Sequence, residues 1–205
     1  MSEASPFLPT PRAKKASVRA ARLAGAQWGV ISARQLRACG VGWSAAGRWR
    51  AAGKLHVIHR GIYALGHPSI PVEGQLVAAL IHAGPDAALS HVTAAWWWGL
   101  IQEQPGRIEV SSPSRARSLP EVLVHHPMQL EQTRQRRFPI TTVARTLVDF
   151  AATEPLNRVR TALAQADYKR LLDVQEVEAA LRRGRPGSAN LRKALERHQP
   201  KLALT

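Results

Sequence analysis

Two short helical segments with clearly marked ends constrain the fold of this chain more than any other feature. Ser32 lies three residues before Gln35. This is the spacing of a capping box, in which each side chain accepts a hydrogen bond from the other residue's backbone N–H. Gly40 then supplies a residue that readily adopts the left-handed conformation, and the apolar Val41 follows it. These signals predict a short helix that begins after Ser32 and ends before Gly40.

A second capped helix and a hairpin are predicted to follow directly. Ser44 is expected to cap a helix over residues 44–52, and Gly53 is expected to end it. Residues 54–58 alternate between polar and apolar side chains, and residues 62–65 form the expected return strand. Two short helices joined by a glycine-containing turn and followed by a hairpin are typical of a winged helix-turn-helix.

The chain has a net charge of +15 over its 205 residues, and most of this positive charge lies in its first third. Residues 1–60 hold eleven Lys or Arg and one acidic residue, Glu3. Residues 61–205 hold eighteen Lys or Arg and thirteen acidic residues. A general preference for Arg would not remove acidic residues from one segment. The distribution therefore favours a polyanionic partner, most commonly nucleic acid.

The second predicted helix and the hairpin carry the side chains that we expect to contact DNA. Arg48 is expected near base edges, because its guanidinium can pair with guanine O6 and N7. Ser44 is expected near a phosphate at the helix N-terminus, and Trp49 is expected to face inward. The full predicted set is Lys14, Lys15, Arg34, Ser44, Ala45, Arg48, Arg50, Lys54, His59 and Arg60, with His59 and Arg60 at the wing tip. Taken singly, each of these residues is equally compatible with an ordinary solvated surface.

The predicted fold class is α+β, in three parts. Residues 1–17 contain three prolines and are expected to form a flexible basic arm. Residues 18–66 form the predicted winged helix-turn-helix, and its first helix is expected over 18–27. The apolar side of that helix is assigned to Val18, Ala21, Leu23 and Ala24. Residues 67–205 are expected to form a mixed α/β domain that ends in helices.

Periodicity gives the expected elements of residues 67–205. Helices are predicted over 72–83, from Ser90 onward, from 141 or 142 to 152, and over 156–169, 174–183 and 189–197. Short strands are predicted over 87–89, 107–110 and 122–125. Ser90 is expected to be a helix cap rather than half of an active-site pair with His91. Arg145 and Asp149 lie four residues apart and are expected to form an intrahelical pair.

The aromatic residues of this region are assigned mainly to the core. Trp96, Trp97 and Trp98 are consecutive, so their indoles point in three directions on a helix. We expect Trp98 in the core. For Trp96 and Trp97 three roles stay open, namely packing in the core, stacking on a base and contact at an interface. Tyr168 is expected to pack against the following leucines, Leu171 and Leu172.

Two further basic segments lie in the second region. Arg115 and Arg117 fall in a polar connection over residues 111–120, and the other segment holds Arg134, Arg136 and Arg137. Both are compatible with an extended DNA footprint, with a surface for an acidic partner, or with ordinary solvated loops.

Several chemical functions are not indicated. Neither His56 and His59 nor His125 and His126 have a Cys or carboxylate partner at zinc-site spacing. There is no Gly-rich phosphate loop, nucleophile elbow or Asp-rich metal pair. We therefore expect no enzymatic activity, no cofactor and no metal. The single cysteine, Cys39, fits a reducing cytoplasm, and no apolar run approaches the roughly 18 residues of a membrane span.

Three blocks of the sequence resemble one family. Residues 29–68, from GVISARQLR to RGIYALGHP, resemble the N-terminal domain of AbiEi-family antitoxins, especially the actinobacterial branch. The segment ALSHVTAA over 88–95, which ends in WGL at 98–100, is similar to the family's second block. FPITTVARTLVD over 138–149 is similar to its third. Together these blocks cover most of residues 28–195.

The resemblance implies a function. In that family the winged helix binds double-stranded DNA, typically inverted repeats in the antitoxin's own promoter. The functional partner is a nucleotidyltransferase-like toxin, which the antitoxin counters without a stable complex. Some related chains continue into a nuclease-like domain, whose acidic core this sequence does not show. Two alternatives stay open, namely a basic protein-interaction module and a shortened relative of a nuclease-carrying family without catalytic activity.

Overall fold

The chain divides into two compact units, Met1–His82 and Ala83–Thr205, of which the computed structural model describes residues 11–198. The division falls near the end of helix α4 (Val72–Ala83), not at residues 66/67 as expected from the sequence. The reason is a small core in which Ala78 of α4 packs with Val30 and Ile62. Helix α4 therefore belongs to the N-terminal unit.

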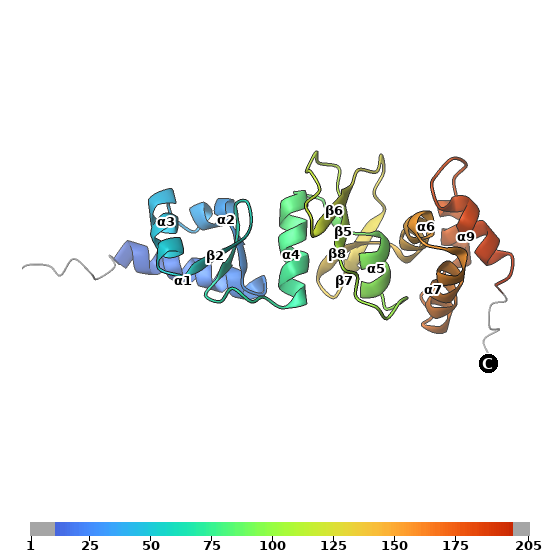
Figure 1. Cartoon of the computed structure of the whole chain (residues 1–205), viewed down its shortest axis with the longest axis horizontal. Coiled ribbons are helices and arrows are strands. Elements are labelled where there is room, and N and C mark those ends of the chain that lie inside the picture. Colours follow the sequence, from blue (N-terminus) through green and yellow to red (C-terminus); the bar gives the residue numbers. More distant parts are fainter. Residues whose placement is uncertain (1–10, 199–205) are drawn as a thin grey trace, which may run out of the picture. The chain divides into compact units, whose positions relative to one another are not determined.

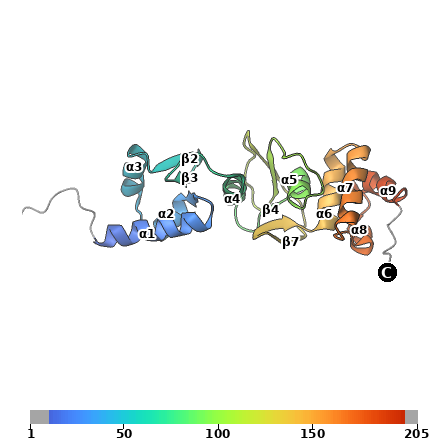
Figure 2. The same ribbon diagram turned by 90° about the horizontal axis from the view of Figure 1, so that it is seen from below.

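The N-terminal unit is a winged helix-turn-helix. Its elements are α1 (Pro11–Ala26), β1 (Val30–Ser32), α2 (Ala33–Ala38), α3 (Trp43–Ala51), β2 (Leu55–His59), β3 (Ile62–Leu65) and α4. The sheet has the order β1-β3-β2 and is antiparallel throughout. Figures 1 and 2 both show α1 running alongside α2, with α3 at the same end of the unit as the N-terminal half of α1. Strand β1 is an element that the sequence analysis did not identify.

The capping signals around α2 are confirmed. The backbone N–H of Gln35 donates to Ser32 Oγ at 3.2 Å, and the N–H of Ser32 donates to Gln35 Oε1 at 2.8 Å. Gly40 has φ +90°, and the N–H of Val41 donates to the carbonyl of Leu36 at 2.9 Å. These bonds fix both ends of the first helix of the motif.

Helix α1 differs from the prediction at its start. It begins at Pro11, so residues 11–17 are helical rather than part of a flexible arm, and residues 1–10 lie outside the described residues. Proline is favoured in the first turn of a helix, and the Ala, Lys and Arg residues that follow are good helix formers. The buried side is a stripe at spacing four, Ala16, Ala20 and Ala24. Val18 and Ala21 of the predicted apolar side are exposed.

Helix α3 also begins earlier than predicted. Its N-cap is Gly42, whose carbonyl accepts from the N–H of Ala46 at 2.9 Å, so Ser44 is not the cap. Glycine is tolerated at this position, and the helix therefore starts at Trp43 and places Ser44 in its first turn. The end is as predicted, because Gly53 has φ +66° and the N–H of Lys54 donates to the carbonyl of Trp49 at 2.8 Å.

The C-terminal unit combines a mixed sheet with a group of helices. Its elements are β4 (Ala88–Leu89), α5 (His91–Trp97), β5 (Ile108–Ser111), β6 (Val122–His125), β7 (Gln132–Gln135), β8 (Phe138–Thr141), α6 (Val143–Thr153), α7 (Leu156–Tyr168), α8 (Val174–Ala180) and α9 (Ser188–Leu195). The strand order is β6-β5-β4-β8-β7, and the pairs β5/β6 and β4/β8 are parallel. Figure 1 shows α6, α7 and α9 grouped on one side of the sheet. The α+β class is confirmed, with a helical C-terminus.

The three tryptophans of α5 and its end are all held by the fold. Trp98 packs against the helical core, as expected, and its Nε1 donates to the carbonyl of Thr141 at 3.0 Å. Trp97 is buried, and its Nε1 donates to the carbonyl of Gln135 at 3.3 Å. Trp96 is partly buried against the same core. The sequence left Trp96 and Trp97 undecided, and both have packing roles.

Tyr168 does not pack as predicted. It is 73% exposed at the end of α7, whereas Leu171 and Leu172 pack against the core. The buried face of α7 is formed by Val159, Ala162, Leu163 and Ala166. Tyr168 follows Ala166 by two residues, which turns its side chain about 200° away from that face at 3.6 residues per turn.

Gly187 joins α8 to α9 where no other residue fits. It has φ +83°, and an added Cβ would lie 2.0 Å from the carbonyl oxygen of Val148 and 2.7 Å from the amide nitrogen of Ala152. We expect Gly187→Ala to lower the free energy of unfolding of the C-terminal unit by about 1–3 kcal/mol more than Gly184→Ala. Gly184 is the control, because it has φ +78° but nothing within 4 Å. Urea unfolding of both variants measures the difference, and equal losses would contradict the predicted clash.

No helix among residues 11–198 is long and apolar enough to cross a bilayer.

Candidate nucleic-acid interface and a polar centre in the second unit

Helix α3 presents a polar, basic face. Trp49 is partly buried against the core of the N-terminal unit, as predicted, and Ala45 packs there too. Ala45 is therefore partly buried, unlike the other predicted residues of α3. The remaining predicted side chains on α3 are exposed, namely Ser44, Arg48 and Arg50.

The other predicted contacts lie on the remaining elements of the same unit. Lys14 and Lys15 are exposed on α1, and the neighbouring Ala16 lies close to Gly40 in the turn before α3. Arg34 on α2, Lys54 before β2 and Arg60 in the wing turn are also exposed. His59 is the last residue of β2 rather than part of the turn, and it is half-buried beside His82, with ring centroids 5.8 Å apart.

The basic side chains of the N-terminal unit have almost no carboxylates near them. Within residues 11–82, the only acidic residue is Glu73, on α4. None of the described Lys and Arg side chains in this range forms an ion pair, whereas Arg145, Arg158 and Arg185 of the C-terminal unit all do. The positive field of the first unit is therefore uncompensated by the unit itself, which suits a polyanion.

Trp43 is a surface residue that the sequence analysis missed. It is the first residue of α3, and it is 75% exposed. An indole this exposed is unusual on a folded surface, and the N-terminal residues of a recognition helix are those that reach base edges. The missed signal was Gly42, which allows the helix to start one residue before Ser44.

The second basic surface consists of two separate parts. Arg115 and Arg117 lie in the connection from β5 to β6 at one edge of the sheet, whereas Arg134, Arg136 and Arg137 belong to the β7–β8 hairpin at the other edge. All five are exposed. The hairpin turns on Arg136 and Arg137, with φ +47° and +75°, and the guanidinium of Arg136 lies over the Trp97 ring at 5.7 Å. Both residues of this tight turn have a left-handed backbone conformation. Glycine or asparagine usually indicates such a turn in a sequence, and arginine does not.

Arg145 of α6 is the centre of a buried ionic network. Its Nε donates to Asp149 Oδ1 at 2.8 Å, as expected from their spacing, and its Nη1 donates to Glu131 and to the carbonyl of Gln129. Arg185 donates to the other oxygen of Glu131 at 3.2 Å. The sequence predicted the first of these contacts and none of the others, because Glu131 and Arg185 come from distant segments.

Burial and charge act in opposite directions in this network. Burial lowers the pKa of Arg145, but Asp149 and Glu131 outweigh it, so the net shift is upward and the guanidinium stays charged. Burial raises the pKa of Asp149, an effect that Arg145 opposes. Burial also acts to raise the pKa of Glu131, but hydrogen bonds from Arg145, from its own backbone and from Arg185 give a net lowering. The pKa shifts of Arg145, Asp149 and Glu131 are those of a buried ion-pair network that stabilises the fold, and they do not require a catalytic role.

A second polar cluster joins α5 to the sheet. The Nε2 atom of His125 lies 2.7 Å from Glu109 Oε2, and the rings of His91 and His125 stack with centroids 3.6 Å apart. Ser90 is the N-cap residue of α5, as predicted, but its hydroxyl makes no capping bond and lies 3.0 Å from His91 Nδ1. Burial, with His125 and Arg145 nearby, lowers the pKa of His91 from 6.5 to about 3, so its ring is neutral at pH 7.

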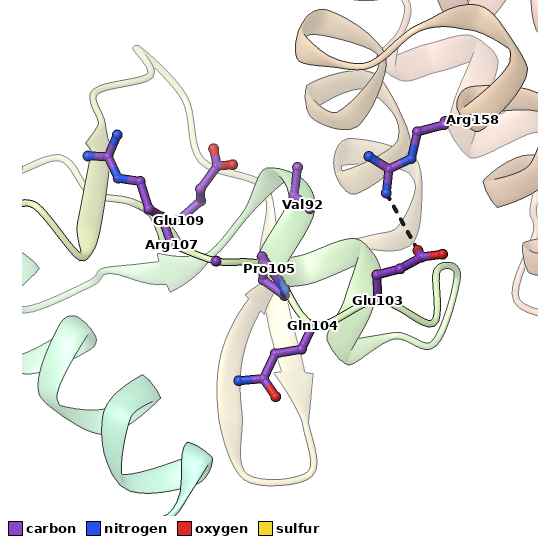
Figure 3. Close-up of a pocket in the computed structure, with 8 residues that line it drawn as sticks. Val92, Glu103, Gln104, Pro105, Arg107, Glu109 and Arg158 are labelled. Atoms are coloured by element: carbon purple, nitrogen blue, oxygen red, sulfur yellow. Dashed lines mark ion pairs between the residues drawn. The ribbon is translucent and has the colours of Figure 1, made fainter.

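The cluster includes a carboxylate that the sequence spacing did not indicate. The parallel pairing of β5 and β6 brings Glu109 to His125, although the two residues are far apart in the sequence. Glu109 also lines an open depression together with Val92, Arg107 and Arg158, shown in Figure 3. In the same figure, Arg158 forms an ion pair with Glu103 at 3.6 Å across the other side of this depression.

The N-terminal unit has the fold of a winged helix-turn-helix with an exposed face on α3. Residues 18–66 match the family model described as "Transcriptional regulator, AbiEi antitoxin", so the winged helix of this chain is similar to the regulator domain of that family. The match covers the helix-turn-helix, the wing and most of α1. No curated protein matches the chain.

Proposed function

We propose that this chain is a sequence-specific DNA-binding repressor that regulates its own promoter as the antitoxin of a type IV toxin–antitoxin pair. The observation that carries the proposal is the match of residues 18–66 to an antitoxin regulator family. The exposed face of α3 and the uncompensated basic charge of the same unit support it.

In the proposed mechanism, α3 enters the major groove. Arg48 reads a guanine through two hydrogen bonds to O6 and N7, and Ser44 in the first turn of α3 contacts a phosphate. Arg60 of the wing and Lys14 and Lys15 of α1 contact the backbone. The phosphate contacts supply affinity and salt dependence, and the base contacts supply sequence preference.

The C-terminal unit would carry the antitoxin activity. The proposed partner is a nucleotidyltransferase-like toxin that the chain counters without a stable complex. Co-expression should restore growth of toxin-producing cells, while the two purified proteins should elute separately in size-exclusion chromatography. A stable co-eluting complex would contradict this part of the proposal.

A promoter–reporter assay tests autoregulation. The chain, supplied from a separate plasmid, should lower expression from the DNA upstream of its own gene, and nuclease footprinting should protect two inverted half-sites there. An unrelated promoter serves as the control. Equal expression with and without the protein would refute autoregulation whatever the DNA affinity.

Trp43 gives a separate test of the docking mode. We expect Trp43→Ala to weaken binding to the upstream DNA by about three- to tenfold, because the indole would contact base edges or thymine methyl groups. Its 75% exposure means that stability should change by no more than about 0.5 kcal/mol. Tyr168→Ala is the matched control, since Tyr168 is 73% exposed in the other unit. Fluorescence anisotropy of labelled DNA measures both, and an equal effect of the two changes would contradict this docking of α3.

A further inference from the structure

We propose that His91, Glu109 and His125 form a binding site for one divalent transition-metal ion, with Zn²⁺ as the reference ion. One donor atom from each of these three residues lies within 4.8 Å of the other two. Two imidazoles and one carboxylate are a donor set that Zn²⁺ and its first-row neighbours favour. The proposal concerns the C-terminal unit and is independent of DNA binding by the N-terminal unit.

The sheet register places the three donors on one face. Glu109 and Ser111 lie two residues apart on β5, and Ser111 pairs with His125 on the parallel strand β6. Side chains two residues apart on a strand share a face, so Glu109 and His125 are diagonal neighbours. Helix α5 packs on β5, where Thr93 Oγ1 accepts from the N–H of Glu109 at 2.8 Å, and this brings His91 at the start of α5 over His125.

His91 keeps one ring nitrogen for an ion. Ser90 Oγ lies 3.0 Å from His91 Nδ1, which leaves Nε2 of that ring for an ion, and metal-bound histidines commonly have such a partner on their other nitrogen. In a tetrahedral Zn²⁺ site the donor atoms lie about 3.3 Å apart, given metal–donor bonds of about 2.0–2.1 Å. The imidazole planes of His91 and His125 are stacked 14° from parallel, and His125 Nε2 lies 2.7 Å from Glu109 Oε2, so binding of an ion requires the rings to turn toward a common point. His91 has φ +51°, a backbone conformation that is uncommon in residues other than glycine. In this conformation the ring of His91 lies over the ring of His125.

The surroundings leave polar capacity unused. Ser111 Oγ, on the same strand face as Glu109, is buried without a hydrogen-bond partner, and so is Asp149 Oδ2. Both are oxygen atoms that a bound ion or its water ligand can satisfy.

An ion can reach the site from solvent. The side chain of His125 is 25% exposed and that of Glu109 is 13% exposed. Glu109 lines the open depression of Figure 3, where Val92 and Arg107 are its neighbours. Three protein donors leave a fourth coordination position for water or for an anionic group entering from this depression.

The test is Zn²⁺ binding to the full-length chain without a histidine tag, measured by competition with a chromophoric chelator and by metal analysis after dialysis. We expect one ion per chain, and at least about tenfold weaker binding for Glu109→Gln and for His91→Ala. His126→Ala is the matched control, because His126 is adjacent to His125 but is not one of the three donor residues, and its Nδ1 lies 3.3 Å from the carbonyl oxygen of Ser112. It should bind Zn²⁺ as the unaltered chain does.

Thermal unfolding gives an independent readout. Zn²⁺ should raise the unfolding temperature of the unaltered chain and of His126→Ala, because a ligand that binds only the folded state stabilises it. At the same Zn²⁺ concentration it should raise that of Glu109→Gln by less, and this variant tests ligation rather than folding because it keeps the size and hydrogen-bonding ability of the side chain. Binding of less than one ion per chain, or unchanged binding by both Glu109→Gln and His91→Ala, would overturn the proposal.

Discussion

Replacing Arg145 with alanine is expected to destabilise the C-terminal unit by about 3–5 kcal/mol, because it leaves buried charge without a partner. Arg145 and Asp149 side chains are each 7% exposed, and Asp149 Oδ2 already lacks a partner. Removal of the guanidinium would leave Asp149 with no cation at bonding distance, and Glu131 would keep only Arg185. The loss should therefore approach the range measured for broken buried ion pairs.

Hydrogen exchange of the full chain measures this change, since it reports the opening free energy of α6 separately from that of the N-terminal unit. Arg158→Ala is the control. Arg158 also pairs with a carboxylate four residues away, Glu154, but its side chain is 39% exposed, so its loss should cost no more than about 1 kcal/mol. Equal losses for the two variants would show that Arg145 is no more important than a surface pair.

A double substitution separates the ion pair from simple packing. Arg145→Met combined with Asp149→Leu removes both charges and fills similar volume, and buried pairs replaced in this way often regain stability. We expect the double variant to be more stable than Arg145→Ala. If it is less stable, the remaining members of the network, Glu131 and Arg185, depend on Arg145 more strongly than the pair itself does.

Replacement of Arg48 with lysine is expected to remove most of the preference for upstream DNA while it keeps most of the affinity for any DNA. Arg48 is exposed on α3, and a guanidinium can form two parallel bonds to guanine, which an ammonium group cannot. A single good bidentate contact is worth about 1–3 kcal/mol of discrimination, so the preference should fall by roughly five- to hundredfold.

Arg60→Ala is the matched comparison for Arg48→Lys. A phosphate contact carries no sequence information, so its loss should weaken upstream and scrambled DNA alike and lower the salt slope by about 1. Anisotropy titrations against both DNAs measure the two variants side by side. If Arg48→Lys keeps the full preference, Arg48 does not read bases, and the docking of α3 must be revised.

Local signals made the N-terminal unit largely predictable from sequence. The Ser32–Gln35 capping box, the glycine after each short helix and the alternating wing depend on residues close together in the chain, and all three are observed. The failures were local too. Pro11 started α1 where a proline-rich arm was expected, and Gly42 replaced Ser44 as the cap of α3.

The polar centre of the C-terminal unit could not be predicted in the same way. The contact of Glu109 with His125 depends on the parallel register of β5 and β6, and the bond of Arg185 to Glu131 joins residues 54 positions apart. The β7–β8 hairpin was missed because its turn uses Arg136 and Arg137 at positive φ, where glycine or asparagine is the usual signal. Only the Arg145–Asp149 pair, one helical turn apart, was accessible to sequence reasoning.

The central claim is that the winged helix recognises a DNA sequence, and one measurement tests it most directly. Fluorescence anisotropy should compare the full chain on DNA from its own upstream region with scrambled DNA of equal length, across a salt series. We predict at least about tenfold tighter binding to the upstream DNA, or about 1.4 kcal/mol, with both affinities falling as salt rises. Equal affinity for the two DNAs at every salt concentration would contradict the claim and leave the basic face as a non-specific polyanion surface.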